Sequence, residues 1–294
     1  MGRPCRKRAF WLAAFAGVLA LALAVSSTLA GIQSSSPASV QEETIELPVI
    51  MYHSLLRNPA AQGDYVISPD ELEQDMCALQ KQGFTPVHME EVFRWQDGEG
   101  ELPEKPVVLS FDDGNYNNYV YALPLAEKYQ MKIIIAPIGK CVDTFTETGE
   151  ENANYSYLTW GRIREMMDCG LVEFQNHTYD LHESKNGRLG AGRLWNESLD
   201  DYQALLREDI GKMQRRFLQE TGYTPRVFVF PFGKISDGAQ EVIWEMGFRC
   251  VFTCANRSNQ ITKGEKHLVL GRFLRPHGIS GEEFLAKALG AADS

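Results

Sequence analysis

Cysteine is scarce in this chain, and the few cysteines present form no pairing or metal-binding pattern. The 294 residues contain six cysteines, no C-x-x-C occurs, and five remain beyond Cys5. An odd number cannot pair completely within one chain, so a disulfide-stabilised scaffold is excluded. We expect most of the five to be small buried hydrophobic residues, with a Cys250–Cys254 bridge as the minor alternative.

Positive charge is also in deficit. The chain carries 29 Lys and Arg against 39 Asp and Glu, and four of the basic residues lie within the first eight positions. The rest therefore has a net charge of 25 − 39 = −14. Such a charge argues against nucleic acid and other anionic polymers as partners, and it is compatible with neutral or cationic substrates. A surface that merely keeps the protein soluble explains the same charge.

Only one long hydrophobic run is present, and it lies near the N-terminus. Sixteen apolar residues, 10–25, follow the basic residues, and small residues continue to Ala30. This is typical of an export signal cleaved after Ala30. The run is shorter than the roughly 20 residues of a spanning helix, but extended to Ala30 it would serve as a membrane anchor.

We therefore assign residues 1–30 to a signal peptide or N-terminal anchor, residues 31–46 to a linker and residues 47–294 to one domain. The protein is expected to be exported, and either secreted or held on the outer face of the cytoplasmic membrane.

The domain alternates short apolar runs with amphipathic segments. A clear helix start is Ser68-Pro69-Asp70-Glu71, which combines an N-cap, a proline at the first helical position and a capping-box glutamate. Repeated strand–helix–glycine units predict a mainly parallel sheet, as in an α/β barrel. The expected strands are 47–52, 107–111, 132–137, 171–175, 226–230, 249–253 and 268–273.

Unusual polar residues follow the ends of these strands. In a β/α barrel the carboxyl ends of the strands form the rim that carries the active site, so this placement predicts a common site. The residues concerned are His53, Asp112, Asp113, His177, the turn Pro231-Phe232-Gly233, Arg272, Arg275 and His277.

Two adjacent carboxylates, Asp112 and Asp113, follow an apolar run that reads as a buried strand, where carboxylates are costly unless they are paired or bind a cation. One of them, with His177 and His182, would make a three-ligand metal site with an open position, and the other would be free to act as a base. Residues five apart lie about 140° apart on a helix, so the two histidines are expected on a strand-to-loop turn. One core and one surface histidine is the simpler alternative.

These motifs resemble those of the polysaccharide deacetylases, also called carbohydrate esterase family 4. The resemblance rests on Phe111-Asp112-Asp113-Gly114, on His177-Thr178 with His182, and on Phe230-Pro231-Phe232-Gly233. It implies a distorted (β/α)7 barrel that removes N- or O-acetyl groups from sugar polymers. It also implies Asp112 as the general base, one divalent metal ion, with Zn²⁺ favoured, on Asp113, His177 and His182, and the backbone N–H of Phe232 as an oxyanion donor.

The early Met51-Tyr52-His53 resembles the circularly permuted branch of this family, typified by poly-N-acetylglucosamine deacetylases. That resemblance implies His53 as the catalytic acid, and His277 is its competitor. One departure concerns Val229, because the family usually has there an arginine that orients the base. Arg272 or Arg275 is expected to replace it from the neighbouring rim.

The predicted function is metal-dependent removal of N-acetyl groups from a cell-wall or extracellular polysaccharide by a monomeric enzyme. An esterase acting on O-acetylated glycans and a non-catalytic glycan-binding surface protein are the alternatives. A helical zinc peptidase motif is absent from the sequence. The motifs identify neither the polymer nor the metal.

Overall fold

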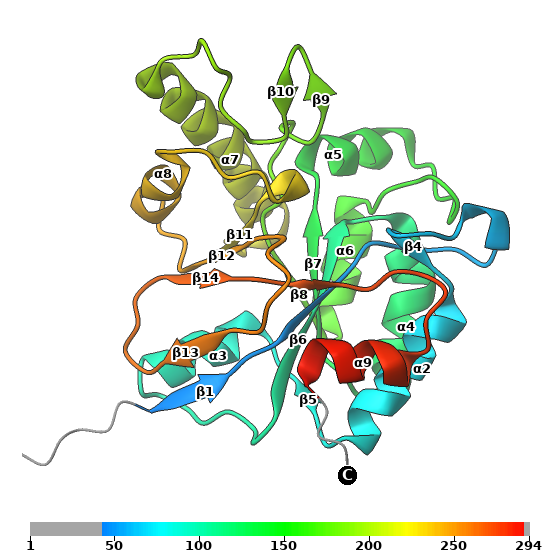
Figure 1. The fold of residues 1–294 in the computed structure, drawn as a ribbon. Helices are drawn as coiled ribbons and strands as arrows, with labels where there is room; N and C mark the ends of the chain where they lie inside the picture. Colours follow the sequence, from blue (N-terminus) through cyan, green and yellow to red (C-terminus); the bar gives the residue numbers. More distant parts are fainter. Residues whose placement is uncertain (1–42, 291–294) are drawn as a thin grey trace, which may run out of the picture. The chain divides into compact units, whose positions relative to one another are not determined.

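Parallel strands form the centre of the computed structural model, which describes residues 43–290 (Figure 1). The predicted export segment, 1–30, and most of the predicted linker lie outside the described residues. Among residues 43–290, no helix is both long and apolar enough to cross a lipid bilayer.

The barrel has seven parallel strand positions, in agreement with the seven strands expected from the sequence. Two short strands, β14 and β15, share the last position. One sheet has the order β15-β2-β6-β7-β8 and another has the order β11-β12-β14. A parallel bridge between Asn176 and Phe228 joins them after β8, and the chain passes from β14 into β15 to complete the circle. The strands are β2 (Val49–Tyr52), β6 (Pro106–Asp113), β7 (Ile133–Pro137), β8 (Val172–Phe174), β11 (Val227–Val229), β12 (Cys250–Phe252), β14 (Leu268–Leu270) and β15 (Phe273–Leu274).

The last predicted strand, 268–273, is divided in the structure. β14 pairs with β12 and β15 pairs with β2, with Gly271 and Arg272 between them. Asn259 holds the break, because its side chain accepts from the Gly271 N–H at 2.7 Å and donates to the Gly271 carbonyl at 3.0 Å. A side chain at Gly271 would meet the Ala255 carbonyl oxygen at 2.4 Å, so this crossing requires glycine.

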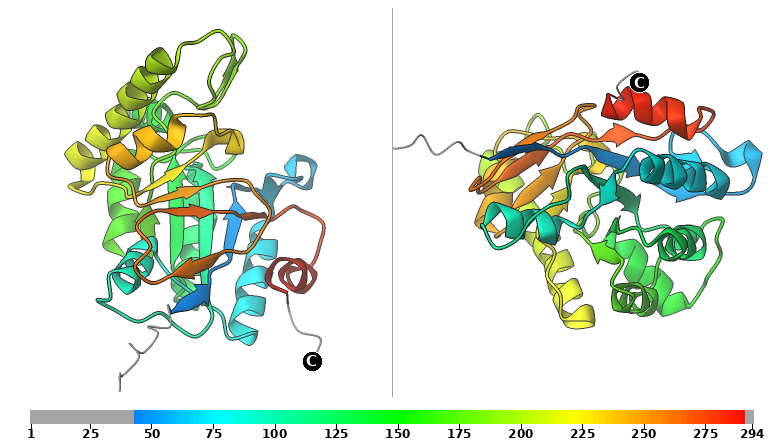
Figure 2. Two further views of the ribbon diagram at one scale, coloured as in Figure 1. Left: turned by 60° about the vertical axis from the view of Figure 1, so that its left-hand side comes forward. Right: turned by 90° about the horizontal axis from the view of Figure 1, so that it is seen from below.

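Helices follow most of the strands, and their ends agree with the capping signals. Ser68 and Glu71 form the predicted capping box at the start of α2, and Thr159 caps α6. The helices are α2 (Pro69–Lys81), α3 (Met89–Gln96), α4 (Leu123–Tyr129), α5 (Gly139–Thr148), α6 (Trp160–Asp168), α7 (Leu199–Thr221), α8 (Ala239–Glu245) and α9 (Gly281–Leu289). Helices α2 and α9 pack against each other beside β2 and β15 (Figures 1 and 2).

Short strands complete the fold and move one predicted boundary. β1 (Thr44–Glu46) pairs antiparallel with β13 (Gln260–Thr262), so the end of the predicted linker belongs to the folded unit. The apolar Ile45 and Ile261 face each other in this pair, which gives β1 a partner that the sequence alone did not indicate. The others are β3 (Ser54–Leu55), β4 (Val66–Ile67), β5 (Thr85–Pro86), β9 (Ser184–Lys185) and β10 (Arg188–Leu189).

Alternate strand residues separate the core into an inner and an outer part. Val49, Val108, Ile134 and Phe252 come from different sides of the barrel and belong to one buried cluster, which fills the interior. Their chain neighbours, such as Leu109, pack outward with the helices. The cysteines are all free in the described chain, and only Cys250 is fully buried, so the expectation that most are buried is wrong.

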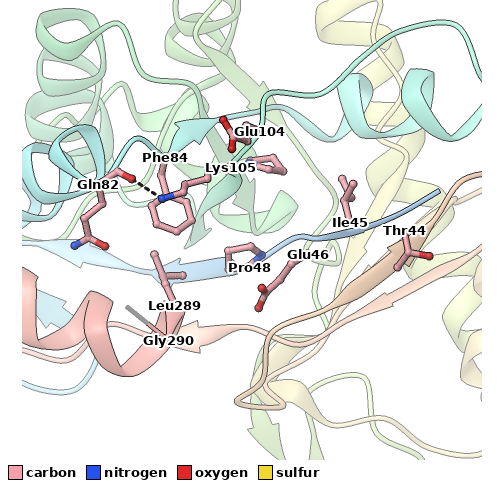
Figure 3. A pocket seen from close by; sticks show the side chains of 11 residues that line it. Thr44, Ile45, Glu46, Pro48, Gln82, Phe84, Glu104, Lys105, Leu289 and Gly290 are labelled. Atoms are coloured by element: carbon pink, nitrogen blue, oxygen red, sulfur yellow. Dashed lines mark hydrogen bonds between the residues drawn. The ribbon is translucent and has the colours of Figure 1, made fainter. Parts of the chain in front are cut away.

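A cavity of about 760 Å³ lies at the amino ends of β2 and β6 (Figure 3). The cavity is lined by the whole of β1, by Lys105 and by the end of α9, and by none of the predicted site residues. Lys105 donates to the carbonyl of Gln82 at 3.1 Å across one side. The carboxyl ends of the same two strands carry His53 and the Asp112–Asp113 pair.

Glu71 in the first turn of α2 ties this helix to the loop before α9. Its carboxylate accepts from the N–H of Ser68 at 2.8 Å and of Gly278 at 3.0 Å, and the His277 ring lies 2.9 Å away. Burial would raise the pKa of Glu71, but these hydrogen bonds outweigh it and lower the pKa from 4.5 to about 2.

We predict that Glu71→Gln flattens the acid end of the stability profile. Because the folded pKa is depressed, the ionised Glu71 stabilises the fold fully above pH 4.5 and loses this effect as the pH falls through 2. The contribution at neutral pH is up to about 3 kcal/mol. Urea unfolding between pH 2 and 6 should show a shallower slope for Glu71→Gln than for the wild type. Glu282→Gln on the exposed face of α9 is the control, and equal slopes for Glu71→Gln and the wild type would contradict the prediction.

Candidate active site

A cavity of about 570 Å³ opens at the carboxyl ends of the barrel strands, where the sequence places its site. It brings together residues from the ends of six strands, β2, β6, β8, β11, β12 and β15. Its lining comprises Met51, His53, Tyr65, Asp112, Asp113, His177, His182, Phe232, Cys254 and Leu274.

Asp113, His177 and His182 form a cluster of potential metal ligands. One ligand atom from each lies within 4.8 Å of the others. Asp113 Oδ1 is 3.6 Å from His177 Nε2 and 3.2 Å from His182 Nε2, and this buried oxygen has no hydrogen-bond partner among the described residues. A carboxylate oxygen left unpaired between two imidazole nitrogens is the arrangement that a divalent cation satisfies.

The tautomer of His177 also fits this interpretation. Its Nδ1 lies 2.8 Å from the carbonyl oxygen of Val229, which can only accept a hydrogen bond. Nδ1 must therefore carry the proton, and Nε2 presents its lone pair to the cluster. Burial lowers the pKa of His182 to about 4, which keeps that ring neutral and able to bind a cation.

Left-handed backbone turns aim the side chains at this end of the barrel. Asp113, Thr178 and Phe232 have φ angles of 69°, 70° and 55°, which non-glycine residues adopt only when surrounding contacts hold them. Gly114 follows Asp113 with φ 73°, and a side chain there would meet Pro137 at 2.4 Å. The glycine of the Asp-Asp-Gly motif is required by this close approach to β7.

Asp112 is buried and held by an arginine from the far end of the chain. Both of its oxygens accept from the Arg272 guanidinium, at 2.6 and 2.9 Å, and Arg272 also donates to Ser110 Oγ at 3.0 Å. Burial would raise the pKa of Asp112, but Arg272 and the nearby imidazoles outweigh it, so the pKa lies well below its usual range. Asp112 is therefore a fixed carboxylate beside the metal-ligand cluster.

His53 lies on the other side of Asp112. Its Nε2 is 3.8 Å from Asp112 Oδ2, and its ring meets the edge of Tyr65 with centroids 5.0 Å apart. Burial lowers the pKa of His53 from its ordinary value. Asn118, in the helical turn after the Asp-Asp-Gly motif, donates to the His53 carbonyl at 2.9 Å and links the two strand ends.

The predicted turn at Pro231 forms one wall of the cavity. Pro231 is buried, whereas the Phe232 side chain is half exposed and its ring lies 4.7 Å from that of His182. Phe232 has a left-handed backbone within this short helical turn and lines the cavity.

Two residues expected near the site lie elsewhere. Arg275 is fully buried, but its guanidinium donates to Asp75 on α2 at 2.8 Å and not to Asp112. Alternate strand residues point to opposite faces and Arg275 is three beyond Arg272, so only Arg272 enters the barrel. His277 pairs with Glu71 on the outside of the barrel and does not line the cavity.

Several lining residues carried no signal in the sequence. Tyr65 follows none of the predicted strands, but its side chain, which is 59% exposed, lines the cavity beside His53. Cys254 follows β12, and its sulfur is 4.0 Å from Arg272. Ser110 could have been found, because it is the one polar residue within the apolar run before Asp112 and it faces the same side.

A second hollow of about 310 Å³ adjoins the first through His182. Phe145 and Tyr157, whose ring centroids are 5.6 Å apart, form part of its wall, and the Lys140–Asp180 ion pair forms another. The site is therefore open along one side of the rim. An open site of this kind can accommodate a long molecule, whereas a closed pocket suits a small one.

A profile of the family described as polysaccharide deacetylase matches residues 99–251, slightly more than half of the chain. The match includes Asp112, Asp113, both clustered histidines and the turn at Pro231. His53 and Arg272 lie outside it, so their place in the site rests on the geometry alone.

Named relatives and solved structures match over most of the described chain. The poly-beta-1,6-N-acetyl-D-glucosamine N-deacetylase of Escherichia coli strain K12 is 28% identical over 222 residues, which are 69% of this chain and 33% of that protein. This chain therefore spans about a third of that relative's length. A de-N-acetylase from Aggregatibacter actinomycetemcomitans is 27% identical with a TM-score of 0.70, and the match covers 82% of this chain and 100% of the other. IcaB from Ammonifex degensii is 26% identical with a TM-score of 0.67 and coverages of 83% and 96%.

Proposed function

This chain belongs to the polysaccharide deacetylase family, and we propose that it hydrolyses N-acetyl groups on a cell-wall or extracellular polysaccharide. The observation that carries the proposal is the joint placement of the Asp113–His177–His182 cluster, the Arg272-held Asp112 and His53 in one open cavity. The names of the relatives favour an N-acetylated sugar polymer as the substrate class. A glycan-binding protein without activity would not need this arrangement.

We further propose that Asp113, His177 and His182 hold one divalent cation, with Zn²⁺ favoured by two imidazoles and one carboxylate. When bound, such a cation supplies Lewis acidity to the acetyl carbonyl and makes water acidic enough to lose a proton near neutral pH. The remaining steps belong to side chains of this protein.

Asp112 is the proposed general base. It accepts a proton from the attacking water, whose oxygen forms a bond to the acetyl carbon. Arg272 keeps Asp112 ionised and fixes both of its oxygens, so the carboxylate needs no reorientation before it accepts the proton. Because the pKa of Asp112 is depressed, the accepted proton is readily passed on.

His53 is the proposed acid. Its Nε2 lies 3.8 Å from Asp112 Oδ2, a separation that one bridging water closes, and along this path His53 receives the proton and delivers it to the amine nitrogen as the carbon–nitrogen bond breaks. The products are a free amine and acetic acid, which loses its remaining proton to water or to the amine and becomes acetate, and both residues return to their starting state. The Phe232 N–H is proposed to donate to the developing oxyanion, with Pro231 fixing the turn.

Localisation is proposed from the sequence alone. The basic start and the apolar run 10–25 support export, and both secretion and attachment through residues 1–30 fit an enzyme whose substrate lies outside the cell. The net negative charge supports a neutral or cationic polymer as substrate.

The decisive assay is acetate release from a panel of acetylated glycans, with and without a chelator. The proposal expects release from N-acetylated polymers that a chelator abolishes and a divalent cation restores. Release from O-acetylated glycans alone would favour the esterase alternative. No release from any of them by metal-loaded protein would favour the binding protein.

Metal content tests the ligand assignment. Purified wild type should carry about one divalent ion per chain, and Asp113→Asn, His177→Ala and His182→Ala should each lose most of it. Elemental analysis after gel filtration measures the ratio. Asp112→Asn is the matched control next to Asp113 and should keep its metal. Full occupancy in all three ligand variants would refute the assignment.

Arg272 and Arg275 offer a matched test of the base. Arg272→Met should reduce turnover by at least about 10²-fold, as Asp112→Asn should, because the base loses the two hydrogen bonds that orient it. Arg275→Met should leave the turnover of folded protein near normal while it lowers the free energy of unfolding by about 3–5 kcal/mol, since Asp75 is left buried without its partner. The reverse pattern of turnover would show that the assignment is wrong.

His53→Ala should bind metal normally and lose about 10²–10⁴ in turnover on an amide substrate. The loss should shrink on an activated acetate ester, whose leaving group needs no proton. His277→Ala should be mild, because that ring faces Glu71 outside the cavity. A severe His277→Ala defect beside a near-normal His53→Ala enzyme would exclude His53 as the acid.

A further inference from the structure

The loop between His177 and His182 has an unusual backbone at its start. Thr178 has φ 70°, a left-handed conformation that is costly for a β-branched residue, on the order of 1–3 kcal/mol. Such a conformation persists only where neighbouring groups hold it. A left-handed residue also turns successive backbone N–H groups to one side, which creates a small concavity that attracts an anion.

A buried carboxylate on α7 occupies that concavity. Asp209 Oδ1 accepts from the Tyr179 N–H and its Oδ2 accepts from the Asp180 N–H, each at 2.8 Å. Asp209 is only 9% exposed, so these two hydrogen bonds are made away from bulk water. Both oxygens are used, and each holds a different residue of the same loop.

The opposite side of the loop is held by the backbone at the start of α5. Gly139 N–H donates to the Thr178 carbonyl at 3.1 Å, and Lys140 N–H donates to the Tyr179 carbonyl at 2.8 Å. A side chain at Gly139 would meet Tyr179 at 2.7 Å, so the two segments are as close as they can be. The loop is therefore held between α5 and Asp209. The Tyr179 and Asp180 N–H groups are held by the Asp209 carboxylate, and the Thr178 and Tyr179 carbonyls by the start of α5.

We propose that Asp209 is a positioning residue for the metal centre. By accepting hydrogen bonds from both N–H groups, Asp209 holds the loop between His177 and His182 in one conformation. In this conformation the two Nε2 atoms lie 3.6 and 3.2 Å from Asp113 Oδ1. Asp209 touches neither histidine ring and acts through the peptide backbone. The inference rests on the proposed metal-binding role of these histidines.

The test is the Zn²⁺ affinity of metal-stripped protein, measured by competition with a chromophoric chelator. Asp209→Asn keeps the size of the side chain but offers one acceptor oxygen, and its NH₂ group then faces a backbone N–H. We expect its Zn²⁺ dissociation constant to rise about 10- to 100-fold. Glu208→Gln, the exposed neighbour on α7, should bind Zn²⁺ like the wild type.

A second control separates positioning from general destabilisation. Leu79→Ala removes a fully buried side chain from α2 and should lower stability while it leaves Zn²⁺ affinity close to the wild type. If Asp209→Asn does not fold, Asp209→Glu keeps both oxygens but shifts them by one methylene group, and a weaker affinity is again expected. Wild-type affinity in either folded Asp209 variant, or an equal loss in Leu79→Ala, would overturn the inference. Failure of the wild type itself to bind Zn²⁺ would instead refute the proposed metal site.

Discussion

The buried ion pair between Arg272 and Asp112 is the constraint on which the rest of the site depends. The two residues are 160 positions apart, and both are almost wholly inaccessible to water. Removing two charges from water is costly unless each is fully paired, and here the two bonds of the guanidinium to the carboxylate supply that pairing. The broken strand at Gly271 makes it possible, because the crossing turns Arg272 into the barrel. The break divides the pairing, so that β14 pairs with β12 and β15 pairs with β2.

Around this pair, the site is assembled from strand ends whose backbones leave the regular sheet. Asp113, Thr178 and Phe232 all adopt left-handed backbone conformations; Asp113 and Phe232 line the cavity, and Thr178 directly follows His177. Strain of this kind must be offset elsewhere, and buried polar contacts do so: Asp209 holds the loop after His177, and Asn118 links the Asp-Asp-Gly turn to His53. Polar residues that take no part in chemistry therefore decide where the reacting groups lie.

The sequence predicted the barrel strands well because each is a short apolar run with a clear end. It also predicted that Asp113 and both histidines would share a site, since parallel strands end at one rim. It could not choose between Arg272 and Arg275, because both follow the last apolar run within three residues. The choice depends on where that run breaks, and the break depends on Asn259 and Ala255, which precede it by more than ten residues. The same applies to β1, because its partner β13 lies more than 200 residues away.

The sequence by itself determined the residue types of the site, their order along the chain and the strand ends that carry them. Local hydrophobic pattern and turn chemistry are enough for this, because they act over a few residues. The tertiary structure alone decided which arginine holds Asp112, that His277 lies outside the barrel, and that Tyr65 and Cys254 line the cavity. These outcomes depend on contacts between distant segments, and close packing allows only one of the otherwise equivalent pairings to form.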